Sequence, residues 1–130
     1  MNECAMNRLF LAEKFRECQN MILALGDETR QHIIIALLES EKAGLRVGEI
    51  TKLTHLSRPA VSHHLKILKD AKIISMRRVG TMNFYYMNAN DTEWGKLTEL
   101  VNKVYDITKK AIHNGYPPFS NEHDDMEYNE

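Results

Sequence analysis

The first part of the chain has a helical pattern of apolar residues, spaced three and four positions apart. These residues are Leu11, Phe15, Cys18, Ile22 and Leu25. The "LGD" that follows at 25–27 places a glycine, which ends helices, beside Asp27, a residue that caps the N-terminus of a helix. The next segment, "ETRQHIIIALLES", is apolar on nearly every side from Ile33 to Leu38 and predicts a central core helix.

Two shorter helices are predicted next. "VGEITKLTHL" forms the first, with Ile50 and Leu53 facing inward. "SRPAVSHHLKILKD" forms the second, with Ser57 as its cap and Pro59 in the first turn, where a missing N–H removes no helical bond. The inward face of this second helix combines three apolar residues with one histidine: Val61, Leu65, Leu68 and His64.

The remaining pattern changes from helix to strand and back. Residues 73–88, "IISMRRVGTMNFYYMN", predict two strands around a tight turn that contains Gly80. Residues 92–114 predict a last helix with a wide apolar stripe, made of Trp94, Leu97, Leu100, Val101, Val104, Ile107 and Ala111. "GYPPF" ends this helix, and the polar, acidic segment beyond is expected to be disordered.

These elements predict a mainly α (α+β) fold. Two helices joined by the short "THL" turn make a helix-turn-helix, and the two-stranded β-hairpin beside them is a wing. The whole is a winged helix-turn-helix with five to six helices. We expect one DNA-binding and dimerisation domain over residues 1–115 and an acidic tail over 116–130.

Composition agrees with one small folded domain. The chain has 130 residues, of which 43% are hydrophobic and 27% charged. Its apolar runs are shorter than the roughly 20 residues of a membrane span, and its N-terminus lacks the pattern of a signal peptide. With only two cysteines it has no disulfide framework, so we expect a cytoplasmic protein.

Charge is unevenly distributed. The formal net charge is −1, but the last ten residues hold five acids, and the remainder has 17 basic against 13 acidic side chains. Residues 55–80 carry a single acid, Asp70, and six basic residues: Arg58, Lys66, Lys69, Lys72, Arg77 and Arg78. Such clustering favours a polyanion-binding face more than the charge of the whole chain does, although charge alone is more typical of an ordinary solvated surface.

Three motifs together resemble the ArsR/SmtB family of bacterial winged-helix repressors. They are "LGDxTR" at 25–30, "SxxAVSHHLKIL" at 57–68 and "G…YY" at 80–86. The similarity extends from about residue 20 to residue 110. It implies a homodimer that binds a palindromic operator on double-stranded DNA and leaves it when an effector binds.

The predicted second helix of the helix-turn-helix suits DNA reading, because it combines an apolar back with small polar and basic residues in front. Arg58 has the geometry to contact guanine, Ala60 to meet a thymine methyl, and Ser62 and Lys66 to contact phosphates. The full predicted DNA-binding set is Ser57, Arg58, Ala60, Ser62, His63 and Lys66 on the helix, with Arg77, Arg78, Thr81 and Asn83 on the wing. For each residue the alternative is a solvated surface position.

The adjacent histidines invite a metal or catalytic interpretation, which their spacing disfavours. Consecutive helical residues point about 100° apart, so His63 and His64 cannot easily bind one metal. His64 is expected to pack inward with a hydrogen bond, and His63 to face DNA. No spacing of nucleophile, base and acid surrounds them, so we do not expect an enzyme.

The family's two usual metal sites lack their ligands in this sequence. Where the family would have cysteines at the start of the third helix, the chain has "RVGEI", with Arg46 and Gly48 at the thiol positions. Where a carboxylate and histidine set would occupy the last helix, the chain has Asn90, Thr92, Lys103 and Asp106. A C-terminal set of His113, His123, Asp124 and Asp125 is better explained by chance composition. We therefore expect no metal and no cofactor.

The first and last helices have apolar stripes wider than one core needs, which predicts that they form the homodimer interface. Cys18 lies on such a stripe and is expected to be a buried packing thiol. The alternative is a redox switch, in which antiparallel helices bring Cys4 of one chain near Cys18 of the other.

We therefore predict a sequence-specific DNA-binding repressor with an effector of unknown identity. The alternatives are a winged-helix protein-interaction module without sequence readout, and a repressor switched by thiol oxidation.

Overall fold

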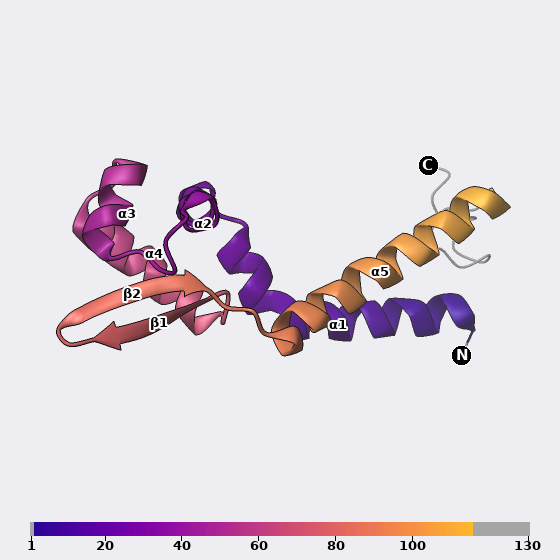
Figure 1. Cartoon of the computed structure of the whole chain (residues 1–130). Coiled ribbons are helices and arrows are strands. Elements are labelled where there is room, and N and C mark those ends of the chain that lie inside the picture. Colours follow the sequence, from indigo (N-terminus) through magenta and orange to yellow (C-terminus); the bar gives the residue numbers. More distant parts are fainter. Residues whose placement is uncertain (1, 116–130) are drawn as a thin grey trace. The chain divides into compact units, whose positions relative to one another are not determined.

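A computed structural model describes residues 2–115 of the chain (Figure 1). Its elements, in order, are α1 (Glu3–Leu25), α2 (Glu28–Glu39), α3 (Val47–Thr54), α4 (Arg58–Asp70), β1 (Ile74–Val79), β2 (Met82–Met87) and α5 (Asp91–Asn114). The predicted order of helices and hairpin is confirmed. The predicted acidic tail, residues 116–130, lies outside the described residues. None of the helices described is long and apolar enough to cross a membrane.

The chain divides into two compact units, each described by itself. The terminal unit contains residues up to Cys18 and residues from Thr92 onward. The central unit contains Gln19–Asp91, and so holds the last part of α1, the helices α2, α3 and α4, and the hairpin.

Side chains from several elements form the core of the central unit. The largest fully buried ones are Ile33, Ile50, Val61, Leu65, Leu68, Ile73 and Ile74. They come from α2, α3, α4 and the start of the hairpin, so the two helices of the helix-turn-helix share one apolar interior with α2 and β1. Burial of this apolar surface is the main force that fixes their positions.

Capping residues set where the helices begin. The side chain of Asp27 accepts a hydrogen bond from Arg30 N at 2.9 Å, and Ser57 Oγ accepts one from Ala60 N at 3.2 Å, as predicted from the sequence. His55 ends α3 in the left-handed conformation, with φ of 59°. This reversal lets the chain turn within three residues into α4.

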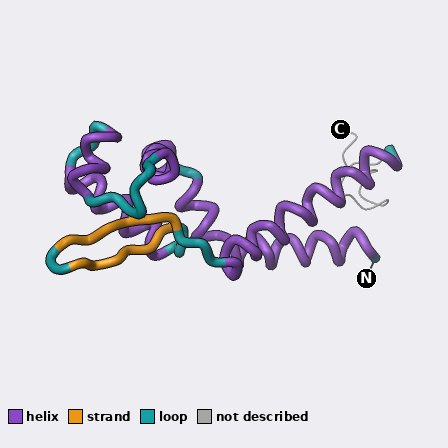
Figure 2. Tube along the Cα trace, in the orientation of Figure 1, coloured by secondary structure: helices purple, strands orange, loops and turns teal. Residues whose placement is uncertain are grey.

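The wing is an antiparallel hairpin with a tight turn (Figure 2). Its register pairs Val79 with Met82 at the tip, and Gly80 between them has a φ of +61° that suits glycine. At the other end the backbones of Leu45 and Tyr85 exchange two hydrogen bonds, of 2.9 and 2.8 Å. The connection between α2 and α3 is thereby attached to β2.

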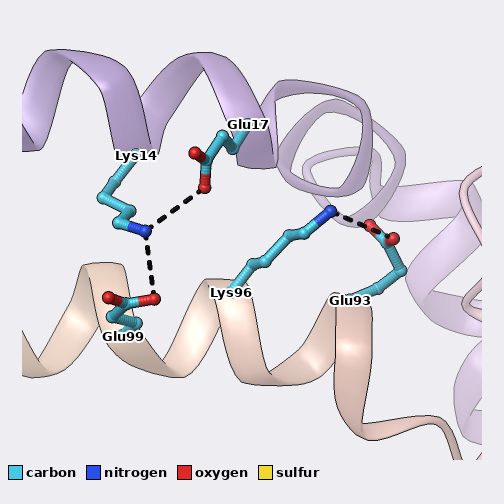
Figure 3. A network of polar contacts seen from close by, with 5 residues as sticks. All are labelled: Lys14, Glu17, Glu93, Lys96 and Glu99. Atoms are coloured by element: carbon cyan, nitrogen blue, oxygen red, sulfur yellow. Dashed lines mark hydrogen bonds and ion pairs between the residues drawn. The ribbon is translucent and has the colours of Figure 1, made fainter.

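The terminal unit pairs the first part of α1 with α5. Polar contacts link the two helices along one side (Figure 3): Lys14 Nζ lies 3.1 Å from Glu99 Oε2 and 3.4 Å from Glu17 Oε2. Leu11, Cys18, Leu100 and Ile107 are buried in this unit. Seven of its large apolar side chains are instead exposed: Met6, Leu9, Phe10, Phe15, Val101, Tyr105 and Ile112.

Two burial predictions were wrong. Leu53 is 57% exposed, because α3 has only eight residues and buries one face through Ile50. On α2 only one side reaches the core, and Ile35 and Leu38 are 49% and 65% exposed. Phe15 lies on the apolar stripe of the first helix that was predicted to form the dimer interface, and it is exposed in the single chain.

The first helix also begins earlier than its apolar stripe. It starts at Glu3, where Asn2 Oδ1 accepts a hydrogen bond from Ala5 N at 2.7 Å and caps it.

Candidate nucleic-acid interface

The two sides of α4 differ as its sequence pattern predicted. Val61, Leu65 and Leu68 are buried against the rest of the central unit. Ser57, Arg58, Ser62, His63 and Lys66 are exposed, and Ala60 is partly exposed. The helix therefore presents small, polar and basic side chains outward from a rigid apolar base. The contact of each with DNA stays a prediction.

Arg58 points toward α3. Its Nη1 lies 3.2 Å from the position that a Cβ on Gly48 would occupy, so the guanidinium packs directly over this glycine. A side chain at position 48 would have to displace it. Close approach between α3 and the first turn of α4 is thus the local role of Gly48.

Arg58 lines a polar cavity of about 470 Å³ between the helix-turn-helix and the wing. Arg46 and Lys52 also line it, together with Thr81 and Asn83. Three cations and one carboxylate, Glu49, therefore line the cavity, and Glu49 is paired with Lys42. The excess of positive charge favours an anion such as a DNA phosphate. The Oδ1 atom of Asn83 is buried here without a hydrogen-bond partner among the described residues.

Arg46 and Lys52 were not in the predicted DNA-binding set. Both lie on or beside α3. The sequence of this helix has an apolar pattern but no cluster of basic residues that would indicate DNA binding. Only the packing of α3 against Arg58 and the wing brings these two cations together with the predicted residues. No local sequence signal would have identified them.

On the wing, both arginines are exposed and have partners within the hairpin. The Arg77 guanidinium lies 5.8 Å from the centre of the Phe84 ring, and Arg78 Nε donates a hydrogen bond to Gly80 O at 3.1 Å. Thr81 is exposed at the turn. The predicted wing residues thus lie at or near the tip of the hairpin, and the guanidinium groups of both arginines are at its surface.

His64 connects α4 to the end of α1 through Arg30. Arg30 Nη1 lies 3.3 Å from His64 Nδ1, while the same guanidinium donates to Ala24 O at 2.8 Å and to Leu23 O at 3.0 Å. Since arginine only donates, Nδ1 is the acceptor and the imidazole is neutral. His64 is half-buried and hydrogen-bonded, as predicted, whereas His63 is exposed.

This environment makes stability depend on pH. Burial lowers the pKa of His64; the Asp27 carboxylate opposes this shift, and the charges of Arg30 and His63 add to it. The unfolded chain, whose histidine titrates near 6.5, therefore binds the proton at a higher pH than the folded chain. We expect the free energy of unfolding to fall as the pH decreases below about 6.5.

Urea unfolding at pH 7.5, 6.5 and 5.5 measures this dependence. His64→Gln, which keeps an acceptor for Arg30 but does not titrate, should flatten it, and the exposed control His63→Gln should not. An unchanged pH dependence in His64→Gln would show that another group is responsible.

Within the described residues Cys4 and Cys18 form no disulfide, and burial raises the pKa of the Cys18 thiol. A raised pKa disfavours the thiolate, which is the form that reacts. This supports the packing role predicted for Cys18 more than the redox role of Cys4 and Cys18. Within residues 2–115 no group of three His, Cys, Asp or Glu side chains is placed to hold a metal ion. Of the C-terminal candidates, His123, Asp124 and Asp125 lie outside the described residues.

Comparison with known proteins gives three independent matches. The model of the family "Bacterial regulatory protein, arsR family" matches residues 27–75. An uncharacterized HTH-type transcriptional regulator of Methanocaldococcus jannaschii is 39% identical over 75 residues, which cover 58% of this chain and 82% of that protein. The transcriptional repressor SdpR of Bacillus subtilis is 36% identical over 69 residues, covering 53% of this chain and 73% of the repressor.

A solved structure extends the likeness to the fold. The ArsR-like transcriptional regulator from Rhodococcus sp. RHA1 superposes with a TM-score of 0.64 at 23% identity, and the match covers 79% of this chain and 93% of that one. The winged helix-turn-helix predicted from the sequence is therefore confirmed.

Proposed function

The chain belongs to the arsR family of bacterial regulatory proteins, and we propose that it represses transcription by binding a palindromic operator as a homodimer. One observation carries the proposal: α4 presents Arg58, Ser62, His63 and Lys66 outward from a fully buried apolar back. This is the arrangement with which a recognition helix enters the major groove. Relatives that share these elements are named as transcriptional regulators and repressors.

We divide the contacts between helix and wing by their chemistry. The exposed residues of α4 face base edges and the nearest phosphates, while Arg77, Arg78 and Thr81 at the wing contact the neighbouring backbone. Asn83 and the cavity cations Arg46 and Lys52 add to the positive field beside the recognition helix. Base contacts then supply sequence preference, and the remaining cations supply affinity.

Dimerisation through α1 and α5 completes the proposal. Both helices carry apolar side chains that are exposed in the single chain, as described above for the terminal unit. Contact of such apolar surface with water is unfavourable, and a partner subunit would cover it. A two-fold dimer would repeat the recognition helix and so require two half-sites about 34–36 Å apart, or a multiple of this distance. An effector that prefers a DNA-incompetent geometry would release the operator by its differential affinity for the two states.

The test is a gel-shift titration with DNA from upstream of the protein's own gene, repeated from 50 to 200 mM salt. If about six phosphates are contacted, affinity should fall roughly a thousandfold over this range, because each contact releases counterions. A scrambled duplex of the same length is the control. Equal affinity for both duplexes, or affinity insensitive to salt, would favour a protein-interaction module without sequence readout.

A further inference from the structure

A second cavity of the central unit adjoins the cationic one, and Glu49 and Lys52 of α3 line both. It has a volume of about 900 Å³ and is lined by α2, α3 and the connection between them. This volume is within the range of small-molecule sites, which run from about 300 to 1,000 Å³. Of its lining residues only Lys52 also belongs to the proposed DNA-binding side, and none belongs to the proposed dimer surface.

The lining combines apolar side chains with separated charges. Ile35, Leu45 and Leu53 line it, and two of them, Ile35 and Leu53, are large apolar side chains that the fold leaves exposed. These are two of the residues that the sequence pattern had predicted to be buried. A ligand with an apolar body would cover them, and removing that surface from water favours binding.

The charges along α3 differ between its two ends. Near the N-terminal end, Lys42 pairs with Glu49, so these two neutralise each other. Glu39, the last residue of α2, adds a carboxylate to the lining. Toward the C-terminal end, Lys52 lines the cavity and makes no ion pair with the described residues. His55 lies beyond it at the helix end and adds an imidazole. Within the part of the chain that the structure describes, Lys52 is therefore a cation without an ion pair, and it lies next in sequence to the exposed apolar Leu53 of the same lining.

Lys52 is also the link to DNA. It lines both this cavity and the cationic cavity that contains Arg58 and the wing residues. An anion bound on the α2 side would attract the Lys52 ammonium and reduce the positive charge available on the DNA side. Affinity for the two anions would thus be coupled through one side chain.

We propose that the cavity between α2 and α3 binds a small organic anion, a carboxylate with an apolar body, and that Lys52 couples this binding to release of DNA. The carboxylate pairs with Lys52 and the apolar body covers Ile35 and Leu53. Only the coupling rests on the proposed function, since binding itself requires no DNA.

Octanoate is the probe, and octan-1-ol and octylamine, with the same apolar chain, are its neutral and cationic controls. The full chain is labelled at isoleucine and leucine methyl groups and titrated without DNA. Octanoate should shift the methyl signals of Ile35 and Leu53 in a saturable manner, and octanol and octylamine should bind at least about fivefold more weakly, given the modest strength of an exposed ion pair. Equal binding of the three probes, or no saturable shift at these methyls, would overturn the proposal.

Two pairs of exposed variants separate the site from general effects. Lys52→Gln should weaken octanoate about fivefold, whereas Lys69→Gln, outside the cavity, should not. Leu53→Asp, which places a carboxylate in the cavity, should weaken it at least about tenfold, whereas Leu38→Asp on α2, which does not line the cavity, should leave it unchanged. A site variant that binds as the wild type does would contradict the assignment.

The coupling is measured by repeating the DNA titration with saturating octanoate. We expect DNA affinity to fall about fivefold in the wild type and to be unaffected by octanoate in Lys52→Gln. Saturable octanoate binding with unchanged DNA affinity would refute the coupling through Lys52. Failure of the protein to bind any DNA would instead refute the repressor function, and the methyl titration would still decide the site.

Discussion

The double substitution Val101→Glu and Tyr105→Glu, on the exposed face of α5, should convert the protein to a monomer and weaken operator binding at least a hundredfold. These side chains are 56% and 61% exposed and lie four residues apart, so they share one face of the helix. Charges there would have to be buried in the proposed interface without partners. Operator affinity would fall because the second half-site is then no longer bound at high effective concentration, an effect of 10²–10⁴ in general.

Light scattering after gel filtration gives the oligomeric state, and a gel shift gives the affinity. Asn102→Glu is the matched control, because it adds a charge about 100° around the same helix, where the wild-type residue is already polar. A double variant that remained dimeric would move the interface away from α5. A monomer with wild-type operator affinity would contradict the two-half-site proposal.

Leu65→Ala should lower the free energy of unfolding by about 2–5 kcal/mol, because it leaves a void behind the recognition helix. Leu65 is almost fully buried in the central unit, between the equally buried Val61 and Leu68. For a unit of this size the midpoint temperature should decrease by on the order of 10–20 °C. Thermal unfolding followed by circular dichroism measures it.

A substitution of the adjacent residue, Lys66, should affect DNA binding and leave stability unchanged. Lys66 is exposed, so Lys66→Ala should change the free energy of unfolding by less than about 0.5 kcal/mol and weaken DNA binding. Reduced stability in both variants, or in neither, would mean that α4 does not have one structural and one functional side.

The division of α4 into two sides was predictable because it depends on local spacing. Val61, Leu65 and Leu68 repeat with the helical period, and Ser57 caps the helix through its own first turn. Both signals lie within one short segment. The hairpin was predictable for the same reason, since its turn and its strands are continuous in sequence.

Features that depend on contacts between elements were not predictable. The inward direction of Leu53 was inferred from the helical period, but α3 is too short to be surrounded on that side. Arg30 reaches His64 across 34 positions of sequence, and Arg46 reaches the wing cavity only because the connection before α3 pairs with β2. The spacing of apolar residues predicts which face of a helix is apolar, but only tertiary packing determines which residues contact that face.

The paired backbones of Leu45 and Tyr85 attach the hairpin to the connection before α3, whereas the hydrogen bond at its tip, from Arg78 Nε to Gly80 O, is local to the hairpin. A Cβ added to Gly80 would meet no atom within 4 Å, and the turn lies beyond the last register pair, Val79 with Met82. Related regulators could therefore gain or lose residues in this turn without disturbing the helices. Wing length would then be an evolutionary variable independent of the recognition helix, able to change how far along the DNA the protein extends while the sequence that it reads stays the same.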